Sequence, residues 1–300
     1  MIVRLSKKTN ERIFAYLLLL PAIIIISAVI IIPLVEAIGY SFTRTSLINF
    51  KEKSYIGFEN YKSILSDSSY YIVLKNTIFI VFSSVGLSLV IGMLLALVLN
   101  NSNHTNILRG LFIIPWLIPG VVIGIIWKWV LATEAGVLNF IFRAVGLTDT
   151  NFPFLSDQKI TPWLVVIVFI WSSVPYILVT VLAALQSVSQ DLEEAAIIDG
   201  ATATQRFFAI IIPIITPVIS IAVVLRVIYT MQDFAIIYSL TQGGPGNATE
   251  TFVISVYKTA FNSSQIGMAC AIGVIWLLLL LVFVLAYFKL LSMSERRMYA

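Results

Sequence analysis

Residues 266–288 read IGMACAIGVIWLLLLLVFVLAYF and contain no charged side chain. An α-helix rises about 1.5 Å per residue, so this stretch is long enough to cross a hydrocarbon layer roughly 30 Å thick. Because a backbone in lipid must satisfy its own hydrogen bonds, an uninterrupted apolar run of this length predicts a membrane-spanning helix.

Five further runs without charge precede it, at about 13–35, 76–99, 110–127, 160–188 and 207–225. Across the 300 residues, 59% are hydrophobic and 11% are charged, whereas charged residues make up about 25% of a soluble globule. The alternating pattern of a transmembrane strand is absent. We therefore predict an all-α membrane protein with six transmembrane helices, at about 13–40, 73–99, 107–131, 160–186, 207–237 and 265–289, between tails at 1–12 and 291–300.

The supply of reactive side chains excludes several functions. Cys270 is the only cysteine, and His104, in a short polar loop where we expect it to be solvated, is the only histidine. An internal disulfide is impossible, and we predict no metal site and no cofactor bound by this chain. The 19 Lys and Arg residues are scattered over tails and loops, which argues against a nucleic-acid groove.

Basic residues before the first run indicate the orientation. Arg4, Lys7, Lys8 and Arg12 form a dense cluster there, whereas basic residues counted over all loops divide equally between the two sides. The first helix usually dominates orientation, so we predict cytoplasmic N and C termini in a multi-pass protein of the cell membrane. The first run is about twice the length of a signal-peptide core, so we expect it to be a retained anchor.

The loop at 187–206 is acidic where a cytoplasmic loop should be basic. Asp191, Glu193, Glu194 and Asp199 fall within a few residues of one another. A loop that lies on anionic lipid would not carry these charges, so a protein partner explains them better. Alanines favour a short surface helix here, and Gly200 marks either its end or a close backbone approach.

These residues resemble the EAA motif of the permeases of binding-protein-dependent ABC importers, which have the MetI-like bundle. The resemblance implies a coupling helix that docks on a cytoplasmic ATPase, a second homologous permease, two ATPase copies that bind ATP and Mg, an extracytoplasmic solute-binding protein and a prokaryotic membrane. The matching positions are Glu194, Ala195 and Ala196, then Asp199, Gly200 and Ala201, then Phe207, Ile210, Pro213 and Pro217.

A second resemblance concerns the carried solute. Residues 234–250 read FAIIYSLTQGGPGNATE and are similar to the segment after the fifth helix in carbohydrate permeases of the maltose and glycerol-phosphate type. The likeness implies sugars or oligosaccharides as solutes. An acidic residue commonly follows the aromatic in that family, whereas here Ala235 follows Phe234 and Asp233 precedes it.

Polar residues inside the predicted spans are candidates for a solute path. Arg226, Tyr229 and Asp233 fall on nearly one helical face, with Gln232 beside them. They could line a sugar path, or Arg226 and Asp233 could form an ion pair near the surface that only fixes the bundle. Trp171 and Tyr176 form a similar patch in the fourth span, where helix packing is the alternative role.

Two other classes of membrane protein have to be weighed. An intramembrane enzyme would need a nucleophile beside a base, but no span contains a histidine and no Gly-x-Ser-x-Gly or His-Glu-x-x-His pattern occurs. An ion-coupled secondary transporter remains the alternative function, although its inverted repeat is not visible. No phosphate-binding loop is present either, so ATP hydrolysis is expected in partner subunits.

Overall fold

The computed structural model describes residues 7–100 and 105–298. His104 and the ends of both predicted tails lie outside the described residues. The chain divides into two compact units, of which the first contains residues 1–66 and 256–275 and the second contains residues 67–255 and 276–300. Five described helical segments are long and apolar enough to cross a membrane, and a bent pair of helices makes a sixth if it counts as one span.

In the first unit, one long apolar helical segment is followed by two short strands and a short helix. The segment is built from α1 (Lys7–Ile26), the π-helical turn η1 (Ser27–Ile31) and α2 (Ile32–Ser41). Strands β1 (Thr43–Arg44) and β2 (Ser54–Tyr55) then pair antiparallel before α3 (Glu59–Ser66). The buried Asn60 amide donates hydrogen bonds to the carbonyl oxygens of Ser41 and Thr43, and so ties α3 to the end of α2.

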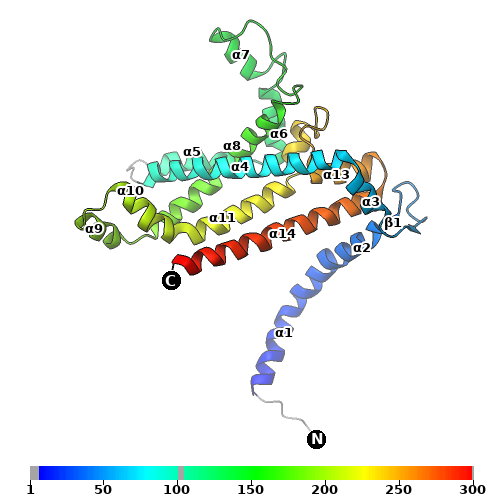
Figure 1. Ribbon diagram of the computed structural model, residues 1–300, viewed down its shortest axis with the longest axis horizontal. Coiled ribbons are helices and arrows are strands. Elements are labelled where there is room, and N and C mark those ends of the chain that lie inside the picture. Colours follow the sequence, from blue (N-terminus) through cyan, green and yellow to red (C-terminus); the bar gives the residue numbers. More distant parts are fainter. Residues whose placement is uncertain (1–6, 101–104, 299–300) are drawn as a thin grey trace. The chain divides into compact units, whose positions relative to one another are not determined.

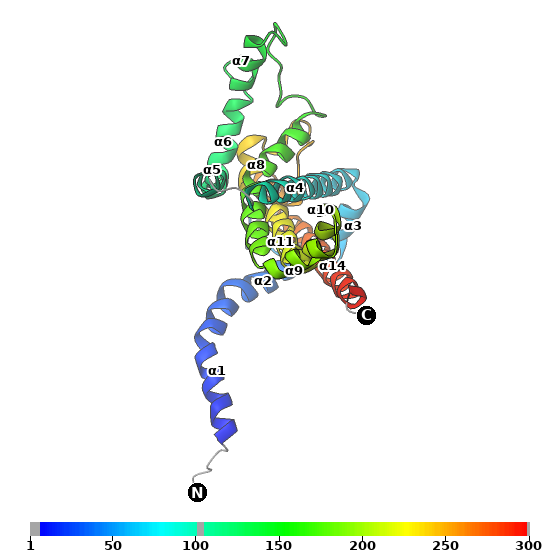
Figure 2. The same ribbon diagram turned by 90° about the vertical axis from the view of Figure 1, so that its left-hand side faces the viewer.

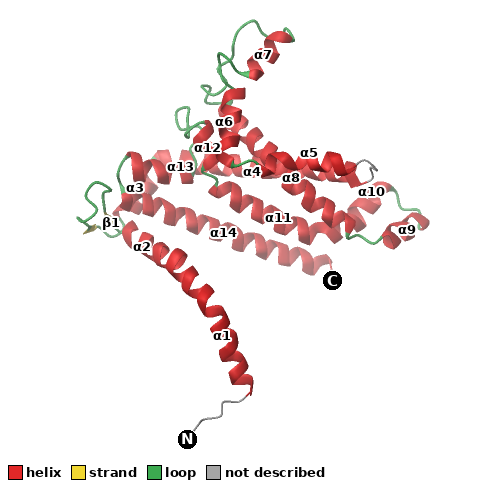
Figure 3. Ribbon diagram, turned by 180° about the vertical axis from the view of Figure 1, so that it is seen from behind, coloured by secondary structure: helices red, strands yellow, loops and turns green. Residues whose placement is uncertain are grey.

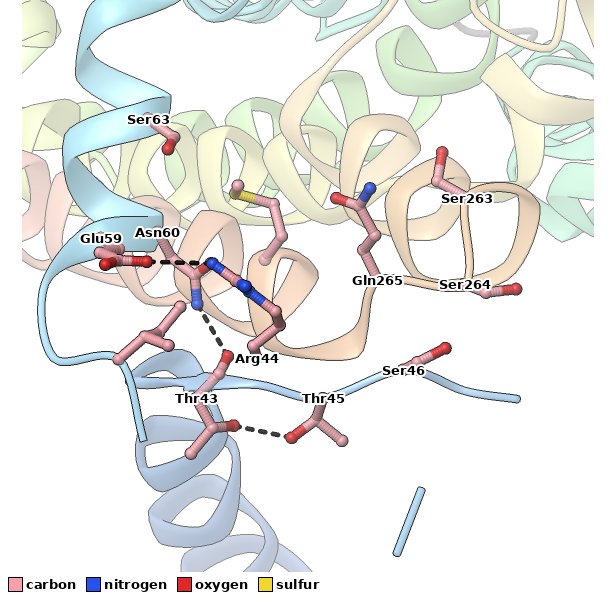
Figure 4. Close-up of a pocket in the computed structure, with 12 residues that line it drawn as sticks. Thr43, Arg44, Thr45, Ser46, Glu59, Asn60, Ser63, Ser263, Ser264 and Gln265 are labelled. Atoms are coloured by element: carbon pink, nitrogen blue, oxygen red, sulfur yellow. Dashed lines mark hydrogen bonds and ion pairs between the residues drawn. The ribbon is translucent and has the colours of Figure 1, made fainter. Parts of the chain in front are cut away.

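The same unit contains an open polar pocket of about 350 Å³. Figure 4 shows Arg44 and Glu59 joined across it by an ion pair of 3.2 Å, with the Ser263–Gln265 side of the pocket opposite. The exposed side chains of this pair make the contact a weak one. None of the residues predicted for a functional site lies in this pocket.

The second unit is a helical bundle built around α8, as Figure 1 shows. The buried residues of α8 include Val165, Phe169 and Ile177, which pack against α4 and the neighbouring helices. Gly92 of α4 allows the closest approach, because an added Cβ there would lie 2.7 Å from the Cγ2 atom of Ile177. The helices of this unit are α4 (Ser68–Asn100), α5 (Thr105–Leu117), α6 (Gly120–Val130), α7 (Val137–Ala144), α8 (Thr161–Gln186), α9 (Gln190–Ile198), α10 (Ala203–Arg206), η2 (Phe207–Ile211), α11 (Ile212–Gln232) and α12 (Ala235–Leu240).

Two helices, α13 and α14, cross the boundary in the sequence between the two units, and the turn η3 lies between them in the first unit. Helix α13 (Phe252–Tyr257) and the π-helical turn η3 (Lys258–Asn262) precede α14 (Ile266–Met298), which begins in the first unit and ends in the second. Within the second unit, Phe252 stacks on Trp276 with ring centroids 5.0 Å apart. Helix α14 therefore begins where the predicted sixth span begins and continues past its expected end at 289.

The predicted third span at 107–131 is not one straight helix. Helices α5 and α6 meet at an angle of 101° across Ile118 and Pro119. Pro119 adopts an extended conformation, with φ −58° and ψ 139°, as the residue before α6. Proline lacks an N–H and disfavours helical geometry in the residue before it, so the break occurs here.

The predicted fifth span at 207–237 also requires correction. The helical segment begins earlier, at Ala203, and ends at Gln232, because Asp233 is extended with φ −72° and ψ 109°. The Asp233 side chain accepts a hydrogen bond of 2.8 Å from the Ile236 N–H, which stabilises the start of α12 as a separate helix. Helix α12 packs on α6, where Gly120 and Gly124 leave room for it.

Candidate functional site

The first candidate site is α9, the helix between α8 and α11. It lies beyond the ends of α8 and α11 in both Figure 1 and Figure 3, and Figure 2 views the bundle from this side. Within α9, Ala196 is the one buried residue, with 8% of its surface exposed. Glu194, Ala195 and Asp199 are exposed. The structure therefore places the predicted acidic residues on a helix that projects from the bundle.

The end of α9 has a defined geometry set by glycine. Gly200 has φ +80°, a conformation that other residues adopt only with strain. The Gly200 N–H donates to the Ile197 carbonyl at 3.0 Å, and the Ala201 N–H donates to the Ala196 carbonyl at 2.9 Å. This pair of bonds is the Schellman motif, which satisfies the last carbonyl groups of a helix. Of the two roles expected for Gly200, the structure selects the helix end.

A capping box then starts the next helix. The Thr202 hydroxyl accepts a hydrogen bond from the Gln205 N–H at 3.3 Å, and the Gln205 side chain accepts one from the Thr202 N–H at 2.8 Å. Reciprocal bonds of this kind fix the direction of the chain. The connector is thus held by backbone and capping bonds at its C-terminal side, although its helix makes little contact with the bundle.

Apolar residues on α9 were not among the predicted site residues. Leu192, Ile197 and Ile198 are exposed, and 86% of the Ile198 surface is accessible. Apart from the two chain neighbours, no heavy atom of the described residues lies within 4 Å of the position where a Cβ on Gly200 would be. The sequence could have indicated these residues, since they are interspersed among the acids of residues 191–199. A projecting helix that exposes both acids and large aliphatic side chains has the composition of a protein-docking surface.

The second candidate site is a cavity of about 480 Å³ in the second unit. It brings together four of the six residues predicted for the solute path, Tyr176 from α8 with Arg226, Tyr229 and Asp233 at the C-terminal end of α11. The remaining lining residues, Trp116 and Leu225, were not predicted. Trp116 follows Pro115 and stands just before the break between α5 and α6, which is the sequence signal that could have found it.

Aromatic rings form one wall of this cavity. The rings of Trp116 and Tyr176 lie with centroids 5.8 Å apart and planes inclined by 54°. Tyr229 exposes 65% of its surface. Rings of this kind offer apolar faces together with polar N–H and O–H groups.

The charged residues of the cavity are close but not paired. No ion pair within 4.0 Å joins Arg226 to Asp233, so the two residues do not form the pair that was the alternative to a solute path. The buried Nε of Arg226 has no hydrogen-bond partner. Arg226 therefore lines the cavity with one of its donors unused, while Asp233 uses one carboxylate oxygen to hold α12.

Two predicted path residues lie elsewhere. Trp171 packs on Trp127, with ring centroids 5.9 Å apart, as part of the apolar core of the second unit. Gln232 is exposed and does not line the cavity. Helix geometry explains both results, since at about 100° per residue Trp171 is rotated by roughly 140° from Tyr176, and Gln232 by roughly 120° from Arg226.

Metal binding finds no support in the described part of the chain. No group of three or more His, Cys, Asp or Glu residues there is arranged to hold a metal ion.

Comparison with known proteins gives a consistent result. The family described as "Binding-protein-dependent transport system inner membrane component" matches residues 88–292. The "Trehalose/maltose transport system permease protein MalF" of Thermococcus litoralis is 32% identical over 94% of this chain and 95% of its own length. The "Sulfoquinovosyl glycerol transport system permease protein SmoG" of Agrobacterium fabrum is 30% identical over 95% of this chain and 92% of its own length.

A solved structure shares the fold. A chain from a bacterial ABC transporter involved in the import of the acidic polysaccharide alginate has a TM-score of 0.80 at 24% identity, covering 97% of this chain and 98% of the other. These relatives are membrane components of transporters without catalytic chemistry of their own, and they leave the ion-coupled secondary transporter without support. This chain belongs to the inner-membrane components of binding-protein-dependent transport systems, the ABC importer permeases.

Proposed function

We propose that this chain forms one half of the translocation path of an ATP-driven saccharide importer, that α9 couples it to a cytoplasmic ATPase, and that the cavity around Arg226 lies on the solute path. The observation that carries the proposal is α9, a helix that projects from the bundle with exposed acids and aliphatic residues and ends at Gly200.

The form of α9 suits a coupling element. Its Schellman motif and the capping box of Thr202 hold the helix end in a fixed direction relative to α11. A force applied to the helix is then transmitted to α11, because few rotatable segments lie between them. The exposed Ile197 and Ile198 supply apolar contact area, and Glu194 supplies a charge that a basic groove would pair with.

A saccharide solute is supported by the lining of the cavity and by the relatives. Tyr176, Tyr229 and Trp116 can stack on sugar rings, and Arg226 and Asp233 can donate to and accept from hydroxyl groups. The named relatives carry trehalose or maltose and sulfoquinovosyl glycerol. A cavity of about 480 Å³ is within the usual range for small-molecule sites.

The remaining parts of the proposal concern partners and orientation. One chain offers one coupling helix, so we infer a second homologous permease, two ATPase copies that bind ATP and Mg, and an extracytoplasmic solute-binding protein. A related alginate transporter has been solved with its periplasmic protein, which supports the last of these. The basic cluster of Arg4, Lys7, Lys8 and Arg12, before the first apolar run, supports cytoplasmic N and C termini.

The test is reconstitution. We expect the tagged chain, purified from the membranes of the cells that produce it, to retain a second permease and an ATPase. Proteoliposomes of that complex should take up labelled saccharide only with internal ATP and the binding protein. Robust ATP-independent uptake by this polypeptide alone would refute the proposal, and so would the absence of any bound ATPase.

A further inference from the structure

We propose, resting on the proposed function, that the cavity of this chain selects saccharides without net charge, whose hydroxyl groups bridge Arg226 and Asp233. The observation behind it is that one cation and one anion line the same cavity without pairing.

Arg226 supplies the donor side. It stands within the apolar segment of α11, where an unpaired guanidinium is costly and is retained when it serves a ligand or a partner. Its buried Nε has no hydrogen-bond partner, and no described carboxylate lies within ion-pair distance of it. Arg226 also lines the cavity, so a hydroxyl oxygen of a bound solute can accept a hydrogen bond from the part of the guanidinium that faces it.

Asp233 supplies the acceptor side. Its Oδ1 accepts the hydrogen bond from the Ile236 N–H, which fixes the carboxylate at the break between α11 and α12. An ionised carboxylate accepts several hydrogen bonds, so its other oxygen stays available to a hydroxyl donor. Hydroxyl groups both donate and accept, and neighbouring hydroxyls on one sugar ring can therefore serve both residues.

The balance of charge sets the class of solute. Arg226 and Asp233 are the two formally charged residues among the six that line the cavity. An anionic solute would gain attraction from Arg226 but meet repulsion from Asp233, and it would lose its hydration without net compensation. A cationic solute faces the reverse. A neutral polyhydroxyl solute pays neither penalty, and the rings of Trp116 and Tyr176 can cover its apolar face.

The names of the relatives do not decide this question. They include a permease for trehalose or maltose, which are neutral, and one for a sulfonated glycoside. The choice between these classes therefore rests on the side chains of the cavity.

The experiment compares two sugars that differ by one phosphate. We would measure equilibrium binding of radiolabelled trehalose and trehalose 6-phosphate to the purified permease–ATPase complex in lipid nanodiscs. We expect trehalose to bind at least tenfold more tightly. Preference for the phosphate sugar, or binding of neither sugar, would overturn the inference.

Variants locate the selectivity in these two residues. Asp233→Asn keeps the carbonyl oxygen that holds α12 but leaves the cavity net positive, so the affinity ratio should move at least tenfold toward trehalose 6-phosphate. Arg226→Gln should move the ratio in the opposite direction and weaken trehalose binding. Gln232→Ala, on the same helix but outside the cavity, should keep the wild-type ratio.

The affinity ratios of the charge variants either support or refute the inference. An unchanged ratio in both charge variants would refute the inference even if both bind sugar. Retention of the ATPase by the same preparations is read separately, so the inference can fail while the proposed function stands. If Asp233→Asn does not yield a folded complex, Arg226→Gln alone carries the test.

Discussion

Replacing Gly200 with leucine perturbs α9 at one defined point. Gly200 has φ +80°, and apart from its two neighbours in the chain no described residue has a heavy atom within 4 Å of an added Cβ. A leucine side chain therefore has room in this chain, and its cost to folding is the backbone strain of left-handed geometry, about 1 to 2 kcal/mol. If a partner surface packs against this turn, the side chain also obstructs that contact, at a cost of about 1 to 3 kcal/mol.

A second glycine provides the matched control. Gly146 ends α7 with φ +73° and has equally open space around it. Its N–H donates to the Arg143 carbonyl at 3.0 Å, and the Leu147 N–H donates to the Phe142 carbonyl at 2.9 Å. This is the same Schellman motif as at Gly200, so Gly146→Leu carries the same backbone strain at a different place.

The two variants should separate folding from docking. We expect similar small losses of thermal stability in detergent for both, because the strain is alike. The apparent affinity for the ATPase, measured by titrating purified ATPase onto permease in nanodiscs, should fall about tenfold or more for Gly200→Leu alone, since about 1.4 kcal/mol corresponds to tenfold. Equal ATPase affinity in the two variants would refute the assignment of α9 as the coupling helix.

Three further changes test other parts of the structure. Glu194→Lys reverses an exposed charge on α9 and should weaken ATPase binding while leaving the melting temperature unchanged; normal binding in low salt would count against a basic groove. Gly124→Ala would place a Cβ 2.6 Å from that of Ser239 and should destabilise the permease by about 1 to 3 kcal/mol in thermal unfolding, whereas Gly86→Ala in α4 meets open space and should not. Asn139→Ala removes hydrogen bonds to the Ala132, Thr133 and Phe152 carbonyls, and should expose the loop around α7 to limited proteolysis without loss of the bundle.

Much of the architecture follows from the hydrophobic pattern. Lipid requires a helix wherever a long apolar run crosses it, so the helical fold could be predicted with no knowledge of packing. The family was indicated by the motif from Glu194 to Pro217. Local signals also placed the connector correctly, since Ala195 and Ala196 favour a helix and Gly200 ends it. Helical periodicity grouped Arg226, Tyr229 and Asp233 on one face, and all three line the cavity.

The bends could not be predicted in the same way, because the hydropathy of an apolar run does not indicate whether the helix through it is straight or broken. Pro175 and Pro217 both lie inside continuous helices, whereas Pro119 stands at a break of 101°. The same residue type gives either result, and surrounding contacts decide between them. At Pro119 the helix that follows can pack on α12 through Gly120 and Gly124, so the bend is stabilised by long-range packing.

The cavity lies where two helical segments are interrupted. Trp116 stands three residues before Pro119, and Asp233 lies at the break between α11 and α12, so both interruptions contribute to the cavity. At an interruption the backbone frees polar groups, and a side chain such as that of Asp233 can bind them while it still lines the cavity. A continuous helix would have turned these residues toward lipid or packed them against neighbours, as happened to Trp171. The apolar runs therefore determine that the chain crosses the membrane, and the few residues that interrupt those runs determine where its cavity lies.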